Sequence, residues 1–110
     1  MGRSYVPDSG DIVWLDFTPD AGHEQAGHRP ALVLSPASYN RRASLMICCP
    51  ITTQEKGYPF EVVLSGSARS VVLSDQMKSL DWRVRRARRK GVATLRELAE
   101  VRAKILALIG

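Results

Sequence analysis

Arg29 is the residue of this chain best placed to act on a phosphate. It precedes Pro30, whose ring fixes its own φ angle and biases Arg29 towards an extended backbone. The backbone therefore aims the Arg29 side chain at the entrance of the apolar segment 31–34. A guanidinium is always charged, and its planar fork of donors matches phosphate oxygens. This arrangement indicates phosphate binding or phosphate chemistry.

Thr52 and Thr53 form a second group of polar side chains. They follow the apolar run 45–51, at the expected end of a strand, where a threonine hydroxyl can contact a phosphate oxygen. Two β-branched residues that merely close a strand have the same pattern, so a structural role stays open. Lys56 and Tyr58 follow, and they add the cation and aromatic face that single-stranded nucleic-acid sites use.

Gln76 and Lys78 are expected on one face of a strand over 76–84. An amide can read base edges and an ammonium can neutralise phosphate, so this face is a candidate for nucleic-acid recognition. The loop 18–28 is a second candidate for recognition. A solvated strand face is the alternative reading of Gln76 and Lys78.

Six of the eight residues from Arg83 to Lys90 are basic. So dense a run repels itself unless a polyanion lies nearby, which favours contact with a nucleic-acid backbone over simple solvation. Arg83 and Arg85 fit one face of a strand, and Arg86 begins the basic turn that follows. The whole chain carries 16 Lys and Arg against 11 Asp and Glu, a net charge of +5. This excess favours polyanionic partners, although it also serves solubility.

Two histidines, His23 and His28, flank a loop that contains glycines. Paired histidines can exchange protons in ribonuclease catalysis. A loop of this composition is a poor support for precise catalysis, so both histidines are expected to contact substrate or to have no role.

The remaining pattern predicts a single α+β domain over 1–110 that is mainly β, with helices. Short apolar segments alternate with turn residues, as in a small barrel or sandwich; they are 11–17, 31–34, 45–51, 60–64, 71–73 and 76–84. Thr94 and Glu97 form a capping box that begins a C-terminal helix. The apolar face of this helix is expected to consist of Leu98, Val101, Ile105 and Leu108.

Cys48 and Cys49 are expected to be reduced and partly buried in a cytoplasmic protein. Neighbours on a strand point to opposite faces, and the two residues lack the spacing of a metal site. Pro50 is expected to place the end of this strand at a sheet edge or bulge. No apolar run approaches the ~20 residues of a membrane span, so no membrane association is expected.

Three segments resemble, in order, the sequence blocks of the MazF/PemK (Kid-like) toxins: residues 24–35, 50–53 and 75–81. The segment 10–14 also resembles the opening strand of that family, so the likeness runs nearly end to end. It implies a small SH3-like barrel with a C-terminal helix that works as a homodimer. The turn 65–70 looks shorter than in close relatives, and the run 83–90 is unusually rich in arginine.

The resemblance implies a toxin of a type II toxin–antitoxin pair. Such toxins are metal-independent endoribonucleases that need no cofactor, cut single-stranded mRNA at short sequences and so inhibit translation. They leave a 2′,3′-cyclic phosphate and a 5′-hydroxyl, and an antitoxin with an acidic, disordered tail silences them. The catalytic arginine of the family corresponds to Arg29 and its threonine to Thr52, and Glu24 matches an acidic loop position implicated in activity.

The chemistry of RNA cleavage agrees with these assignments. The 2′-hydroxyl of the substrate is the nucleophile, so the protein must orient the backbone and stabilise a dianionic phosphorane. Arg29 and Thr52 supply donors for that charge, each often worth ~3–4 kcal/mol. The general base stays open, although Glu24 is chemically easier than an arginine whose pKa lies above ~12.

Two other functions are weighed against cleavage. A noncatalytic barrel that binds nucleic acid explains the charge and the strands but not the combination of Arg29 with Thr52. A toxin that poisons gyrase, as the CcdB group does on a related fold, would depend mainly on the C-terminal helix.

Overall fold

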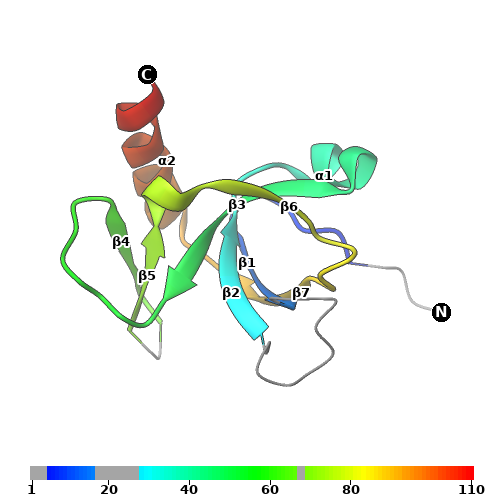
Figure 1. Ribbon diagram of the computed structural model, residues 1–110, viewed down its shortest axis with the longest axis horizontal. Coiled ribbons are helices and arrows are strands. Elements are labelled where there is room, and N and C mark those ends of the chain that lie inside the picture. The colour runs from blue at the N-terminus through cyan, green and yellow to red at the C-terminus, as the bar shows by residue number, and fades with distance from the viewer. Residues whose placement is uncertain (1–4, 17–27, 67–68) are drawn as a thin grey trace.

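The computed structural model describes residues 5–16, 28–66 and 69–110. The expectations for His23 and Glu24 therefore lie outside the described residues. Within these ranges seven strands form one strongly curled antiparallel sheet in the order β4-β5-β3-β2-β1-β7, with β6 paired to β3 off this path (Figure 1). The strands are β1 (Asp11–Asp16), β2 (His28–Val33), β3 (Leu45–Thr52), β4 (Glu61–Leu64), β5 (Ser70–Leu73), β6 (Lys78–Asp81) and β7 (Arg88–Val92). With two α-helices, this half-barrel confirms the predicted α+β class.

The strand β3 belongs to both halves of the curled sheet because it changes partner along its length. It pairs with β6 up to Cys48 and with β5 from Ile51 onwards. Pro50 lies between the two pairings, where its missing N–H leaves no ladder bond unmade. The strand therefore continues past Pro50 to Thr52, and the proline marks the change of partner rather than the end of the strand.

Strand alternation divides the core into two clusters. Cys49 joins the cluster that includes Leu98, Val101 and Ile105 of α2 (Leu95–Ile109), whereas Cys48 joins the cluster around Trp82. Both cysteines are free and buried, as expected. The expectation for Leu108 is wrong, since 51% of its surface is exposed. Figure 1 shows the reason: the last turns of α2 project beyond the sheet.

The helix α1 (Ala37–Ala43) and the strand β7 lack any apolar period, and both escaped the sequence analysis. The only buried residue of α1 is Asn40. Its Nδ2 atom donates to the carbonyl oxygens of Pro7 and Ser35 at 2.7 and 3.0 Å. Its backbone carbonyl accepts from the Trp82 indole at 2.8 Å. Neither α1 nor α2 is long and apolar enough to cross a membrane.

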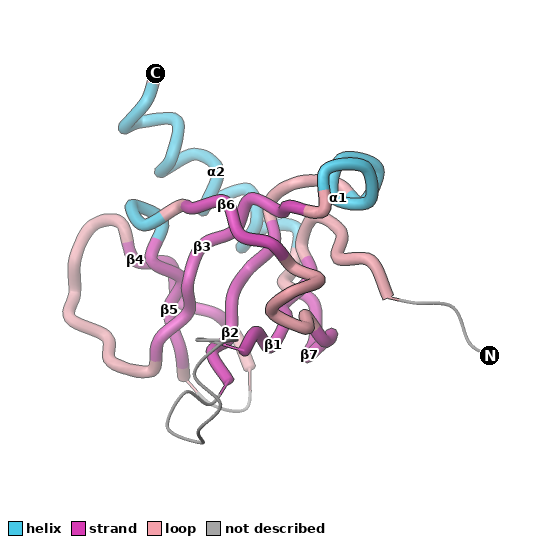
Figure 2. Tube along the Cα trace, turned by 45° about the vertical axis from the view of Figure 1, so that its right-hand side comes forward, coloured by secondary structure: helices cyan, strands magenta, loops and turns pink. Residues whose placement is uncertain are grey.

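The predicted strand 76–84 is wrong at both ends. Gln76 closes a short 3₁₀ helix, η2 (Ser74–Gln76), and residues 82–86 form turns after β6. Figure 2 shows this looped segment next to the sheet rather than as a continuation of it. Within the turns Arg86 has a φ of 53°, a left-handed conformation that favours glycine.

The Glu97 carboxylate joins α2 to the end of β4. It accepts from the Ser65 N–H at 2.6 Å, the Ser65 hydroxyl at 2.8 Å and the Thr94 N–H at 2.8 Å. The Thr94 hydroxyl in turn accepts from the Glu97 N–H, which completes the predicted capping box. Burial raises the pKa of Glu97, but these hydrogen bonds outweigh burial and lower it below its ordinary value of 4.5.

Replacing Glu97 should therefore destabilise the protein in a pH-dependent way. Glu97→Ala is expected to lower the free energy of unfolding by about 2 kcal/mol near neutral pH, because it leaves the Ser65 N–H without this acceptor. The lowered pKa stabilises the fold at pH values above 4.5, and this contribution is lost as the pH falls through the folded-state pKa. Urea unfolding at pH 7 and at about pH 3 measures both effects. Glu100→Ala, an exposed change on the same helix, is the control, and an equal loss in both variants would contradict the prediction.

Glycine at position 86 should stabilise the fold. A non-glycine residue in the left-handed region costs about 1 kcal/mol, so Arg86→Gly is expected to raise the free energy of unfolding by up to that amount. The exposed Val84 of the same turn has no positive φ, and Val84→Gly is therefore expected to destabilise. Thermal unfolding of the two variants checks the sign, and a lower midpoint for Arg86→Gly would refute the strain.

Candidate functional site

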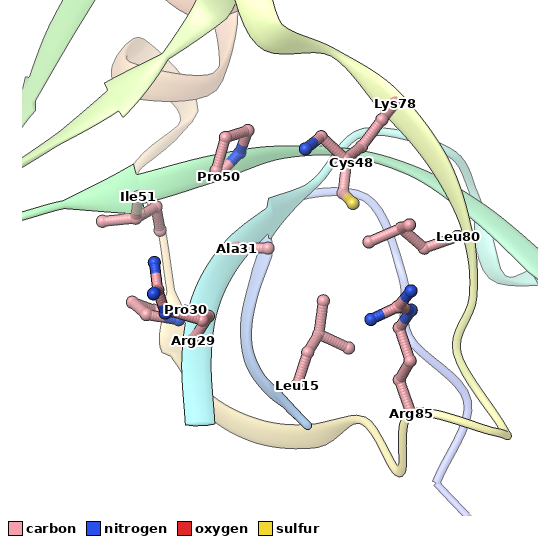
Figure 3. A pocket seen from close by; sticks show the side chains of 10 residues that line it. All are labelled: Leu15, Arg29, Pro30, Ala31, Cys48, Pro50, Ile51, Lys78, Leu80 and Arg85. Carbon is pink, nitrogen blue, oxygen red and sulfur yellow. The ribbon is translucent and has the colours of Figure 1, made fainter. Parts of the chain in front are cut away.

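A cavity of about 240 Å³ lies between β2, β6 and the turns that follow β6. We call it the Arg29 cavity. Among the described residues, its charged lining consists of Arg29, Lys78 and Arg85, and its apolar walls include Leu15 and Leu80. Figure 3 shows the Arg29 side chain reaching from β2 towards Ile51, while Arg85 rises from the turn beside Leu80. The remaining lining residues are Pro30, Ala31, Cys48, Pro50 and Ile51.

The Arg29 cavity is strongly cationic. Three of its described lining residues are basic and none of them is acidic, which suits an anion with an apolar portion. The turn that carries Arg85 is fixed to the end of β1: the Asp16 N–H donates to the Arg85 carbonyl at 2.8 Å, and the Arg85 guanidinium donates to the Asp16 carbonyl at 3.3 Å. A residue of an irregular turn is thereby held in a defined place.

The thiol on the wall of this cavity is not set up as a nucleophile. Burial raises the pKa of Cys48 to about 11, and that of its neighbour Cys49 to about 12. Only a thiolate attacks efficiently, and at neutral pH these groups are thiols. Cys48 therefore serves as a small apolar wall, and the chemistry of the cavity rests on its cations.

A second cavity, of about 260 Å³, adjoins the first, and we call it the Trp14 cavity. Pro30 and Ile51 line both cavities. The Trp14 cavity also contains Trp14, Lys90, Thr52 and Thr53, the last two at the end of β3, together with Glu97 and the apolar residues Ile12, Leu64 and Val92. The two cavities therefore adjoin at Pro30 and Ile51.

Arg29 and Thr52 approach this shared wall from neighbouring strands. The register pairs Ala31 with Pro50, so Arg29 and Thr52, each two residues further, project from the same face of the β2–β3 pair. Thr52 Oγ1 accepts from the Gln54 N–H at 3.1 Å, and its own O–H is still able to donate. Arg29 borders the first cavity and Thr52 the second, so the two donors flank the rim between them.

The predicted recognition residues separate into different places. Lys56, Tyr58 and Gln76 line a third cavity of about 170 Å³ with Thr52, and we call it the Lys56 cavity. Its loop is held by the Glu61 carboxylate, which accepts from the N–H groups of Lys56 and Gly57. Gln76 and Lys78 were expected on one strand face, but they border different cavities because Gln76 still belongs to η2, whereas Lys78 begins β6.

The basic run 83–90 does not form one cationic face. Arg83 donates to the Ser44 hydroxyl at 2.7 Å and to the Arg41 carbonyl at 3.3 Å, and its guanidinium stacks over Trp82, so it anchors the end of α1. Arg85 lines the Arg29 cavity, whereas Arg86 is exposed in the turn. Arg89 lies 3.9 Å from the Asp11 carboxylate. The folding of the chain thus distributes charges that the sequence presents as one group.

His28 belongs to a charged cluster at the end of β1 and β2. Its Nδ1 atom lies 3.1 Å from Asp16 Oδ1 and 3.0 Å from a guanidinium nitrogen of Arg88. Arg88 also lies 3.7 Å from the Asp16 carboxylate. Arg29, the next residue of β2, projects from the opposite face. The sequence analysis missed Asp16 and treated Arg88 and Lys90 only as part of the basic run 83–90. The β1–β2 register places Asp16 beside His28, and the β1–β7 register brings Arg88 and Lys90 to the same strand.

Comparisons with known proteins match this chain along its whole length. Residues 8–109 match the family model described as PemK-like, MazF-like toxin of type II toxin-antitoxin system. The endoribonuclease toxin MazF of Escherichia coli K12 is 58% identical over 111 residues, which cover 100% of both chains. The endoribonuclease toxin ChpB of the same organism is 36% identical over 107 residues, which cover 91% of this chain and 91% of that one.

Solved structures agree with the sequence comparisons. A crystal structure of MazF from Deinococcus radiodurans superposes with a TM-score of 0.86 at 57% identity, covering 97% of this chain and 99% of that one. A MazE–MazF crystal structure from the same organism gives a TM-score of 0.88 at 55% identity, with 96% and 98% coverage. This chain belongs to the PemK-like, MazF-like toxins of type II toxin–antitoxin systems.

Proposed function

We propose that this protein is an endoribonuclease toxin that cleaves single-stranded RNA without a metal ion. The observation that carries the proposal is the strand register, which places Arg29 and Thr52 opposite each other on β2 and β3 beside two adjoining cavities, with Lys78 and Arg85 in the same cavity as Arg29. The names of its relatives, endoribonuclease toxins MazF and ChpB, support the same activity.

Cleavage begins when the 2′-oxygen of the substrate attacks the neighbouring phosphorus. The bond from phosphorus to the 5′-oxygen breaks, which leaves a 2′,3′-cyclic phosphate and a 5′-hydroxyl. One proton leaves the 2′-hydroxyl and one reaches the departing 5′-oxygen. The phosphorane between these steps carries two negative charges, and the Arg29 guanidinium and the Thr52 hydroxyl donate to its oxygens. Donors placed in advance on a rigid sheet lose little free energy in reorganising as that charge develops.

Other residues bind the strand rather than the reacting atoms. Lys78 and Arg85 contact phosphates beside the cleaved bond, and Lys56 with Gln76 contacts the strand beyond Thr52. Thr53, His28 and the exposed Arg86 contribute from the rims. Arg83 contributes least, because its donors already hold the end of α1. Glu24, the candidate general base, lies outside the described residues.

The proposal includes the surroundings of the toxin. A cognate antitoxin with an acidic tail would find complementary charge in the Arg29 cavity, and the MazE–MazF structures of relatives support such a partner. A homodimer is supported by an open apolar surface on another side, lined by Leu34, Ile47, Met77 and Leu106. We propose messenger RNA as the substrate. The toxin would then act in the cytoplasm, and cleavage of its substrate would inhibit translation.

Removing the Arg29 guanidinium should abolish cleavage. Arg29→Ala is expected to slow the cutting of a defined transcript in EDTA by at least about 100-fold, because one donor to the phosphorane is lost. Arg96→Ala removes an exposed cation from α2 and is expected to cut at the wild-type rate. Circular dichroism checks that both variants fold. Cleavage by Arg29→Ala at the wild-type rate would show that Arg29 takes no part in the mechanism. If the wild type bound RNA but gave no cleavage products, a noncatalytic nucleic-acid-binding module would be favoured.

Lys78 should contribute through charge alone. The binding constant of a non-cleavable oligonucleotide falls as the salt concentration rises. In Lys78→Gln the magnitude of the slope of log K against log salt is expected to be smaller by about 0.7, because one phosphate contact is lost. Arg96→Gln serves as the matched loss of one charge elsewhere and is expected to leave the slope unchanged. Fluorescence anisotropy over a series of salt concentrations measures both slopes. Equal slopes for wild type and Lys78→Gln would exclude this contact.

A further inference from the structure

The Trp14 cavity has a shape and position that cleavage alone does not require. It is slightly larger than the Arg29 cavity, about 260 against about 240 Å³, and the two share the walls formed by Pro30 and Ile51. Arg29 borders one and Thr52 the other. A phosphate contacted by both donors would lie beside Pro30 and Ile51, with one cavity on either side of it.

Trp14 provides an aromatic face in this cavity, and Lys90 lies over it. The Lys90 ammonium is 5.2 Å from the centroid of the half-buried Trp14 ring. A β-bulge places it there: the register shifts between Ile12 and Val13, so Lys90 falls between the residues paired with them. Lys90 is exposed, and its flexible stem allows it to leave the ring when another group stacks there.

The charges of the Trp14 cavity favour a neutral ring over a phosphate. Among the described residues that line it are one ammonium, on Lys90, and one carboxylate, on Glu97, whereas the described lining of the Arg29 cavity has three cations. Glu97 is only 8% exposed, and Ser65 and Thr94 donate to both of its oxygens. A phosphate would meet this fixed negative charge, but a nucleobase would meet an aromatic face and the apolar side chains of Ile12, Leu64 and Val92.

We propose that the Trp14 cavity binds the nucleobase of a nucleotide adjacent to the cleaved phosphate. The base stacks on Trp14 in the place of Lys90, and the displaced ammonium contacts the phosphate of that nucleotide. Stacking of this kind accepts any base and places the strand in register with Arg29 and Thr52. The inference rests on the proposed RNA cleavage, because it concerns the same strand of RNA at the same rim.

The test joins a protein variant to a substrate variant. The cleavage position is first mapped with the wild type. Oligonucleotides are then made with 2′-deoxyribose at that position, which removes the attacking hydroxyl. In two further oligonucleotides an abasic site replaces the base on one side or the other of the cleaved phosphate. In the wild type, one of the two abasic sites is expected to weaken binding about tenfold. Trp14→Leu is expected to weaken binding of the intact oligonucleotide by a similar factor. The same variant is expected to bind the abasic oligonucleotide as tightly as the intact one. Trp14→Phe keeps an aromatic face and is expected to retain most of the affinity.

Lys90 has a matched control on its own strand. Arg89 pairs with Val13, projects from the opposite face and lies beside Asp11. Lys90→Gln is expected to lower the salt dependence of binding, whereas Arg89→Gln removes the same charge and is expected to leave it unchanged.

Several results would overturn the inference and leave the proposed cleavage intact. In one such result the wild type cleaves RNA, and the abasic site weakens binding by the same factor in the wild type and in Trp14→Leu. Another is a Trp14→Leu variant that binds and cuts RNA normally but no longer binds an acidic peptide, which would assign the cavity to a protein partner. A wild type that cuts no RNA would instead refute the proposed function itself.

Discussion

The site depends on the way β2 is held between β1 and β3. Both edges of this strand are paired, with Leu15 opposite Arg29 on one side and Pro50 opposite Ala31 on the other. Both faces of this strand are buried, because Ala31 and Val33 join one core cluster and Leu32 joins the other, so a slip by one residue would exchange the side chains between the two clusters. Since Ala31 and Val33 are buried in the same alternation, the core fixes the direction of Arg29. The reacting guanidinium thus inherits its position from hydrophobic packing.

Charge follows from the same constraint. Several cations of the basic run 83–90 are held by contacts with particular groups. Arg83 holds α1, Arg88 joins Asp16 and His28, and Lys90 covers Trp14, so each is directed by a particular strand or turn. Two neighbouring cavities of similar size consequently differ in charge. This difference allows one rim to hold a phosphate while treating the nucleotides on its two sides differently.

Buried polar groups fix the irregular parts of the structure. Asn40 connects α1, the N-terminal segment and Trp82 through three hydrogen bonds, and Trp82 begins the turns that carry Arg85. Glu97 connects α2 to the end of β4 in the same manner. Because an unpaired polar group in these places would be costly, each connection holds a turn in one geometry. Turns without an apolar face of their own can thereby support a precise site.

Local pattern determined the parts of this protein that depend on neighbours in the sequence. The capping box at Thr94, the buried strands around Val13 and Val72, and the extended backbone at Arg29 before Pro30 all follow from local rules of φ angle, period and capping. The helix at Asn40 and the strand from Arg88 to Val92 did not, because neither has an apolar period.

Tertiary structure alone decided which distant residues meet. Gln76 ends η2 while Lys78 begins β6, and the β1–β7 register brought Lys90 to Trp14 across a long stretch of chain. A residue's type and spacing report its own backbone preferences, whereas a cavity requires strands to be paired in one register. That register is set by the packing of the whole core, and no local segment contains it.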